Sequence, residues 1–457
     1  MQRRLLIFVL ALAAAIPVAA QTDTSQSSPQ SSQPVMPAHV GSETPGLASQ
    51  SDLEYKNVIV ASFLGGAMYE DNAIAVAATG STPAHFTGDK RFFAQPSIAY
   101  QRTHRNTRIT VSYAPGIDGS IQNASGASYT HNLSADVQFS PFSRMIIHLR
   151  QDYSVSTNPF ESVGKVSVLP SLGGYFGPNY DGVLPSTKRT SLISTAELSY
   201  VMTPRTSLGF TGGYQRFDYN PIVAPNSVTA LTTLIGARDI NASMFFTRQM
   251  TKRNSVGLQY AFMDIHSLPS ARTQSHGLLL FDSWQLSRHT SLMVYGGAEF
   301  SRSHNVFPVQ LGPFTLLASA DTSGWRPTAG LAYQWSGERN AIQIQAVHRL
   351  SDGGGLMSTV SMTYGAIGWH TRLTRRWTMD TTFRVTDQEG LSLTNQSSAF
   401  RSYWGGLSLS RTVTRNFSIQ FEYAHINQTG TGLTTSPTDH NLYQMGIQYY
   451  LVKPLGR

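Results

Sequence analysis

Three residues whose types suit hydrolysis stand close together in one short segment, His148, Asp152 and Ser154. A histidine base, a carboxylate that orients it and a hydroxyl nucleophile are the parts of a catalytic triad. In an extended strand the three share one face, with ~7 Å between residues two apart. His148 and Asp152 are about twice that distance apart, which is beyond hydrogen-bond reach. We therefore predict that the chain is not an enzyme and that these residues belong to a polar strand face.

Other chemistry is excluded by the residues that the chain lacks. It contains no cysteine, so disulfides, thiolate metal sites and cysteine nucleophiles are ruled out. No Gly-rich phosphate loop, His-Glu-x-x-His motif or carboxylate-rich calcium loop occurs, and we predict no metal and no cofactor. The formal charge of +8 does not indicate nucleic acid, because the basic residues are scattered through short turns.

The elements that position these side chains are predicted by a strict alternation of residue types. From about Asn57 to Leu451, runs of about 10 residues alternate apolar with polar or small side chains. In one such run Ile109, Val111 and Tyr113 alternate with Thr110 and Ser112. A period of two is that of a β-strand whose opposite faces meet different environments.

The connections between these runs alternate between short and long. About eight short turns join strands in pairs, one apolar run precedes the first pair (Val58, Val60 and Leu64) and one follows the last, which gives about 18 strands. The longest of the longer loops covers about 156–188. The predicted short turns are Arg105-Asn106, Pro141-Phe142, Pro204-Arg205, Lys252-Arg253, Arg288-His289, Gly337-Glu338, Arg375-Arg376 and Arg415-Asn416.

Two runs fit this pattern less well. Asp282 shares the face of Leu278 and Leu280, so either a bulge resets the alternation there or the faces are assigned wrongly. The run from Ser358 to His370 is ambiguous as well.

The composition favours a transmembrane antiparallel β-barrel. Hydrophobic residues make up 40% of the chain and charged residues only 13%, against roughly 25% charge in soluble domains. Mean hydropathy is nevertheless −0.18. A barrel reconciles these values, because one strand face meets lipid and the other meets water. A soluble secreted β-protein would predict loops of comparable length at both ends.

The first fifty residues are predicted to lie outside the barrel. Arg3 and Arg4 precede a short apolar run, and Val18-Ala19-Ala20 supplies small residues for cleavage, so we predict a signal peptide at 1–20. Residues 21–52 are rich in Ser, Gln, Pro and Thr and are predicted to form a disordered periplasmic leader. The barrel is predicted to span 53–457.

The last strand resembles the assembly signal of bacterial outer-membrane β-barrel proteins, porin-like barrels included. Gln444, Gly446, Tyr449 and Leu451 match its pattern of a polar residue, a glycine two later and two alternating aromatic or apolar residues. The chain departs from many such barrels, because it continues through 452–457 and does not end in Phe. The resemblance implies an outer-membrane location with short turns and both termini in the periplasm and long loops outside. It implies as partners the barrel assembly machinery, outer-membrane lipid and lipopolysaccharide.

The inward faces of a barrel of this size are expected to line a water-filled lumen. Charges of both signs would orient passing polar solutes, or would pair with each other and stiffen the wall. The 156–188 loop would either fold inward, as the third loop of general porins does, or form an exposed lid. By alternation the candidate pore-lining residues are Arg108, Asp136, Arg150, Asp152, Glu197, Glu299, Arg349, Asp380, Arg384 and Glu422.

These features favour a channel through which polar solutes cross the outer membrane. An exporter of an exopolysaccharide is an alternative that rests on analogy of barrel size alone. A structural barrel that displays adhesin or receptor loops is a third hypothesis. The sequence leaves open the substrate, gating, the exact strand count and whether the chain forms a homo-oligomer.

Overall fold

The computed structural model describes residues 57–76, 85–121, 127–156, 187–221, 236–267, 271–311, 314–351, 359–390, 399–430 and 439–454. All of them belong to one compact unit that spans Pro37–Arg457. The predicted signal peptide, the predicted leader and nearly all of the 156–188 loop lie outside the described residues. Within the described ranges, no helix is long and apolar enough to cross a membrane.

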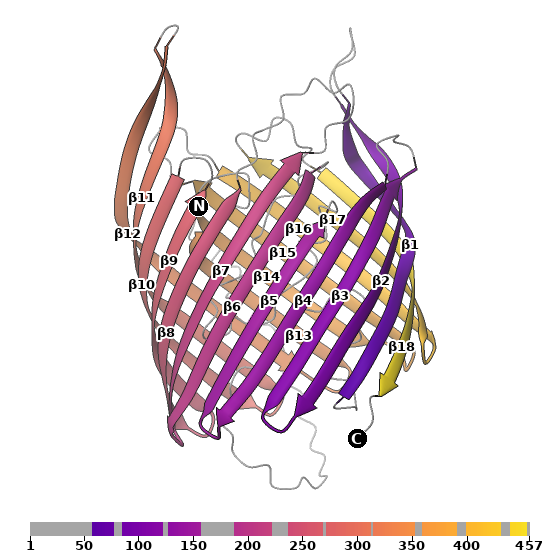
Figure 1. Ribbon diagram of the computed structural model, residues 1–457, viewed down its shortest axis with the longest axis horizontal. Coiled ribbons are helices and arrows are strands. Elements are labelled where there is room, and N and C mark those ends of the chain that lie inside the picture. Colours follow the sequence, from indigo (N-terminus) through magenta and orange to yellow (C-terminus); the bar gives the residue numbers. More distant parts are fainter. Residues whose placement is uncertain are drawn as a thin grey trace. The chain divides into compact units, whose positions relative to one another are not determined.

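Eighteen antiparallel strands form one closed sheet. Each strand pairs with its neighbours in sequence, and β1 also pairs with β18. The sheet therefore closes on itself, and we call the β1–β18 pairing the seam. This confirms the predicted barrel of about 18 strands, which run obliquely around it (Figure 1). The strands are β1 (Asn57–Val76), β2 (His85–His104), β3 (Thr107–Ser120), β4 (Ala127–Phe142), β5 (Met145–Ser156), β6 (Thr187–Thr203), β7 (Thr206–Pro221), β8 (Ala237–Thr251), β9 (Asn254–Ser267), β10 (Ala271–Ser287), β11 (Thr290–Leu311), β12 (Phe314–Ser336), β13 (Asn340–Ser351), β14 (Val360–Arg372), β15 (Trp377–Gly390), β16 (Ala399–Thr414), β17 (Phe417–Gly430) and β18 (Asp439–Pro454).

The short turns gather at one rim of the barrel, which we call the short-turn rim. We call the opposite rim the long-loop rim. Arg105-Asn106 joins β2 to β3 as predicted, with Arg105 at a φ of 43°. The turn predicted at Pro141-Phe142 is wrong by two residues, because β4 continues to Phe142 and β5 begins at Met145. Val58 faces Pro454 across the seam, so the barrel begins and ends at the short-turn rim.

The outer face is apolar and exposed. Large side chains such as Phe210, Met244, Leu258 and Leu280 point outward and are exposed, as the alternation predicted. Asp282 also lies on this face, and β10 has no bulge there, because its register with β9 and β11 is continuous at this point. The amide Nδ2 of Asn254 donates to Asp282 Oδ1 at 2.5 Å, which satisfies the carboxylate near the short-turn rim.

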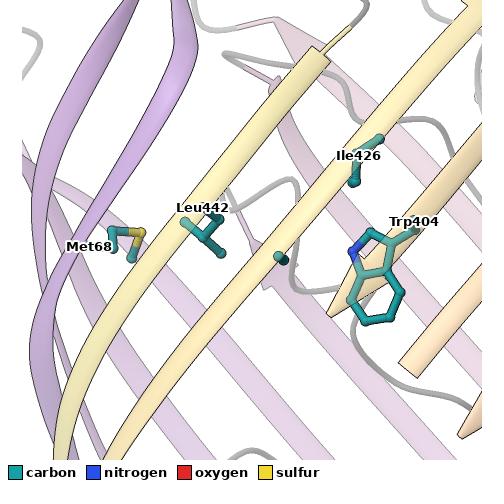
Figure 2. Close-up of a cluster of buried hydrophobic side chains, with 5 residues drawn as sticks. Met68, Trp404, Ile426 and Leu442 are labelled. Carbon is teal, nitrogen blue, oxygen red and sulfur yellow. The ribbon is translucent and has the colours of Figure 1, made fainter. Parts of the chain in front are cut away.

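The inner face contains apolar side chains that the sequence pattern did not place there. Val58, Val60 and Leu64, the apolar run predicted for the first strand, point inward and are buried, so they do not face lipid. Phe63 and Tyr69 occupy the outer face of β1, so both of its faces are apolar. Further round the wall, a buried inner cluster joins β1, β16, β17 and β18 through Met68, Trp404, Ala424, Ile426 and Leu442 (Figure 2).

Candidate functional site

The candidate site is the inner face of the barrel, and all ten predicted charges lie on it. Each shares its strand face with small polar or buried residues and alternates with outward apolar ones, as Asp136 does between Leu133 and Phe139. The faces therefore follow the alternation from which they were predicted. The ten are Arg108, Asp136, Arg150, Asp152, Glu197, Glu299, Arg349, Asp380, Arg384 and Glu422.

Several of these charges are paired with a neighbour. His148 Nε2 lies 2.6 Å from Asp136 Oδ2 on the adjacent strand, and Arg150 Nε lies 2.6 Å from Asp152 Oδ2 on the same strand. Asp380 Oδ1 lies 2.6 Å from His370 Nδ1 near the short-turn rim. Pairing within the wall, one of the two alternatives, is therefore observed for these residues.

The pairing also separates the residues that could have formed a triad. His148 contacts Asp136, whereas Asp152 is bound to Arg150. The hydroxyl of Ser154 lies 2.7 Å from that of Ser191. In the described part of the chain, no group of three His, Asp or Glu residues is placed to hold a metal ion.

Access to water is uneven around the inner wall. Arg150 and Asp152 keep 27% and 23% of their side-chain surface exposed. Glu299 and Arg384 were expected to stay hydrated, and they do not, because their exposed fractions are 0% and 3%. Thr328 Oγ1 donates to Glu299 Oε2 at 2.9 Å, and the Arg384 guanidinium lies 5.1 Å from the centre of the Trp404 ring. The charges on the inner faces of β4 and β5 therefore keep more access to water than Glu299 and Arg384 do.

One charged cluster near the long-loop rim was missed by the sequence reasoning. Arg91 of β2 lies 2.7 Å from Asp118 Oδ2 of β3 and 3.8 Å from Asp89 Oδ2. Beside them, His440 Nδ1 of β18 lies 3.8 Å from Glu70 Oε1 of β1. Continuing the alternation of the predicted first run beyond Leu64 would have placed Glu70 on the same face.

Strands β12 and β13 are hydrogen-bonded to each other only near the short-turn rim. Their ladder stops at the pair Ala329 and His348, whereas β11 and β12 remain paired up to Leu311 and Phe314. Figure 1 shows β11 and β12 extending beyond their neighbours.

Pro327 explains where this ladder stops. The N–H of Ser336 donates to His289 O, on the β11 side, and that of Gly337 donates to Asn340 O, on the β13 side. Consecutive residues of a strand direct their backbone N–H and C=O groups to alternate sides. Because β12 has no register shift against β11, its even-numbered residues bond to β11 and its odd-numbered residues direct these groups toward β13. Pro327 is the next such position after Ala329 and has no N–H to donate.

The β13–β14 hairpin, freed from β12, leans across the inside of the barrel. Leu350, near the end of β13, packs against Met263 and Ile265 on the inner face of β9. The hydroxyl of Thr359, just before β14, lies 2.8 Å from that of Thr273 on the inner face of β10. We call these two contacts the cross-lumen contact. They narrow the lumen on the side of β9 and β10.

The four residues of the predicted assembly signal lie in the closing strand. Gln444 and Gly446 point inward, and Tyr449 and Leu451 point outward and are exposed. Gly446 faces Gly66, and Leu451 faces Ala61, across the seam between β18 and β1. Recognition of this strand by assembly machinery stays a prediction.

A closed antiparallel barrel with an apolar exposed outside and a charged inner wall is the architecture of one class of protein. The chain folds as a β-barrel of the membrane-spanning type. No protein-family model matches its sequence, and no curated protein matches it.

Solved structures similar to the chain include the ferric-catecholate import receptor Fiu from E. coli K12 in its open form (TM-score 0.45, 9% identity, 86% of this chain and 81% of that one). They also include OccAB3 from Acinetobacter baumannii (TM-score 0.42, 8% identity, 87% and 99%). A third is OprD from Pseudomonas aeruginosa (TM-score 0.39, 10% identity, 88% and 98%). These likenesses are distant, and the fold rests on the strand pairing described above.

Proposed function

We propose that the barrel is a non-enzymatic channel for polar solutes, with its path along the inner faces of β4, β5 and β6. The observation that carries the proposal is the combination of charge and water access there. Asp136, Arg150 and Asp152 keep roughly a quarter of their side-chain surface exposed on the inner wall. A charge that keeps part of its hydration costs little, and it acts on any solute that passes.

We further propose that the short-turn rim faces the periplasm. Both ends of the barrel lie at this rim, and in outer-membrane barrels the short turns are periplasmic and the long loops extracellular. In this orientation a solute entering from outside meets the cross-lumen contact first and the paired charges of β4 and β5 afterwards. The cross-lumen contact would limit the size of the solutes that pass, and the charges would select among them by the sign of their charge.

Replacing Arg150 with glutamine is expected to move ion selectivity toward cations. The change removes one inward positive charge and leaves Asp152 without the guanidinium that pairs with it. We expect the cation-to-anion permeability ratio to rise roughly two- to five-fold at low salt, and less at high salt, where the charge is screened. The measurement is the reversal potential of single channels in planar bilayers under a salt gradient.

The matched control is Arg401→Gln, the same substitution on the outer face. Arg401 pairs with Asp387 at 2.6 Å and is exposed on the outside of β16, so the permeability ratio should not change. A folded barrel that carries no steady current would contradict the channel proposal and leave the exporter and receptor hypotheses. Equal shifts in both variants would show that Arg150 does not line the path.

A further inference from the structure

A row of basic side chains crosses five neighbouring strands on the outer face. Arg216 of β7 lies directly opposite Arg238 of β8, and Arg238 lies opposite His266 of β9. His266 lies opposite Arg272 of β10, which in turn lies opposite His304 of β11. Directly opposite residues share a face and are neighbours across the ladder. We call these five residues the basic row, and it spans about 19 Å, or four interstrand spacings of about 4.8 Å.

The basic row faces outward, at the edge of the apolar band on the long-loop side. Its residues lie on the same outward face as exposed apolar side chains of their strands, as Arg238 does with Ile240 and Met244 on β8. Aromatic side chains lie two to six residues nearer the short-turn rim, among them Tyr214, Tyr260 and Phe300. Aliphatic ones lie beside them, since Ile240 is opposite Tyr214 and Leu278 is opposite Tyr260.

The aromatic side chains next to the row locate it relative to a membrane. Aromatic side chains collect where the hydrocarbon ends, so the basic row lies just beyond that boundary, at the level of lipid headgroups.

The row carries more positive charge than its own neighbours neutralise. Like charges placed directly opposite destabilise a sheet, and three aspartates offset part of this cost. Asp218 lies 2.7 Å from Arg216, Asp264 lies 2.7 Å from Arg272, and Asp321 lies 2.6 Å from His304. The adjacent Arg302 is 3.9 Å from Asp321, and within the described ranges no carboxylate forms an ion pair with Arg238. The four arginines outnumber the three aspartates, so the surface is positive even with neutral histidines.

We propose that the basic row, together with Arg302, binds the phosphorylated headgroup of the outer-leaflet glycolipid, lipopolysaccharide. A planar guanidinium binds phosphate oxygens in pairs, and the row is long enough to engage more than one phosphate. The exposed apolar side chains directly beneath it would contact the acyl chains of the same molecule. A glycolipid matches both surfaces at once, whereas a free anion matches only the row. The proposal rests on the orientation proposed above, with the long-loop rim outward, and does not depend on channel activity.

The test compares binding of lipopolysaccharide to the full chain in detergent and to two variants, by native mass spectrometry and by titration of a fluorescent lipopolysaccharide. One variant combines Arg238→Gln, Arg272→Gln and Arg302→Gln. We expect its affinity to fall roughly 100-fold, since each guanidinium near an anionic surface contributes a factor of about five. The control is Arg401→Gln, an exposed arginine of the outer face beyond the basic row, which should bind as the unaltered chain does.

A second measurement uses the unaltered chain only, so it does not depend on the variants folding. Dephosphorylated lipopolysaccharide should bind far more weakly than the phosphorylated form, and inorganic phosphate should compete poorly. The proposal is overturned if dephosphorylation changes nothing, if the folded triple variant keeps its affinity, or if inorganic phosphate competes as well as the glycolipid. Because binding needs no current, a barrel that conducts without binding refutes this proposal alone. A barrel that binds lipopolysaccharide but carries no current refutes only the channel proposal.

Discussion

Replacing Gly66 with alanine is expected to prevent closure of the barrel. Gly66 lies on β1 opposite Gly446 of β18, and a Cβ at this position would stand 2.0 Å from Met445 O and 2.8 Å from Gly446 Cα. Both of these are backbone atoms, so no side-chain rotation relieves the overlap, and the two strands must move apart. The β1–β18 ladder is the seam that makes the sheet a ring, and backbone groups left unpaired in a membrane cost several kcal/mol each.

The measurement is folding into detergent micelles, followed by the heat-dependent migration of the barrel in gels and by urea unfolding. We expect most of the Gly66→Ala chain to remain unfolded. The matched control is Gly405→Ala on β16, where a Cβ would meet no atom within 4 Å. Alanine in a strand is favoured over glycine by roughly 0.5–1 kcal/mol, so this control should fold at least as well as the unaltered chain. A Gly66→Ala barrel as stable as the control would show that the seam accommodates the extra carbon.

The strand count was predictable because two independent signals agree. The period of two marks each strand, and short basic turns such as Arg105-Asn106 mark one rim. The face of a strand was predictable wherever its two sides differ in polarity, as on β3 with Val111 outside and Ser112 inside. On β1 this signal fails, because Val60 and Phe63 make opposite faces equally apolar, and only the pairing with β2 and β18 decides between them.

The candidate site was predictable only as a set of inward charges. Alternation places Asp136 and Arg150 inside, but it cannot show that His148 pairs with Asp136 instead of Asp152. That pairing depends on the register of β4 against β5, which the hydrophobic pattern fixes only in parity. The basic row was missed for the same reason. Its arginines are scattered in sequence, and only direct opposition across four ladders aligns them.

The cross-lumen contact lies further from what a sequence pattern can show. Leu350 alternates with the inward Arg349, so its parity assigns it to the outer face of β13. It is nevertheless buried against Ile265, because the hairpin leaves β12 at Pro327 and enters the barrel. An outward side chain that packs on the inner face of a distant strand breaks the assumption that parity alone determines environment.

Replacing Leu350 with aspartate is expected to enlarge the conducting path. Leu350 is 2% exposed among Met263 and Ile265, and an unpaired carboxylate buried there costs about 3–5 kcal/mol. Release of the hairpin from β9 relieves that cost, since it returns the carboxylate to water. Single-channel conductance should then rise roughly two-fold, because pore width limits the current. Conductance in planar bilayers and the size limit in a liposome-swelling assay measure the change.

A disulfide can reverse this release and so test its cause. The chain has no cysteine, and the hydroxyls of Thr273 and Thr359 lie 2.8 Å apart, which suits the exchange of both residues for cysteine. Under oxidising conditions the triple variant with Leu350→Asp, Thr273→Cys and Thr359→Cys should return to the lower conductance, and a reductant should raise it again. The two cysteines alone should leave the current insensitive to the reductant, because Leu350 still holds the hairpin in place. If Leu350→Asp folds and conducts as the unaltered chain does, the constriction lies elsewhere, and the narrowing between β9 and β13 has no part in transport.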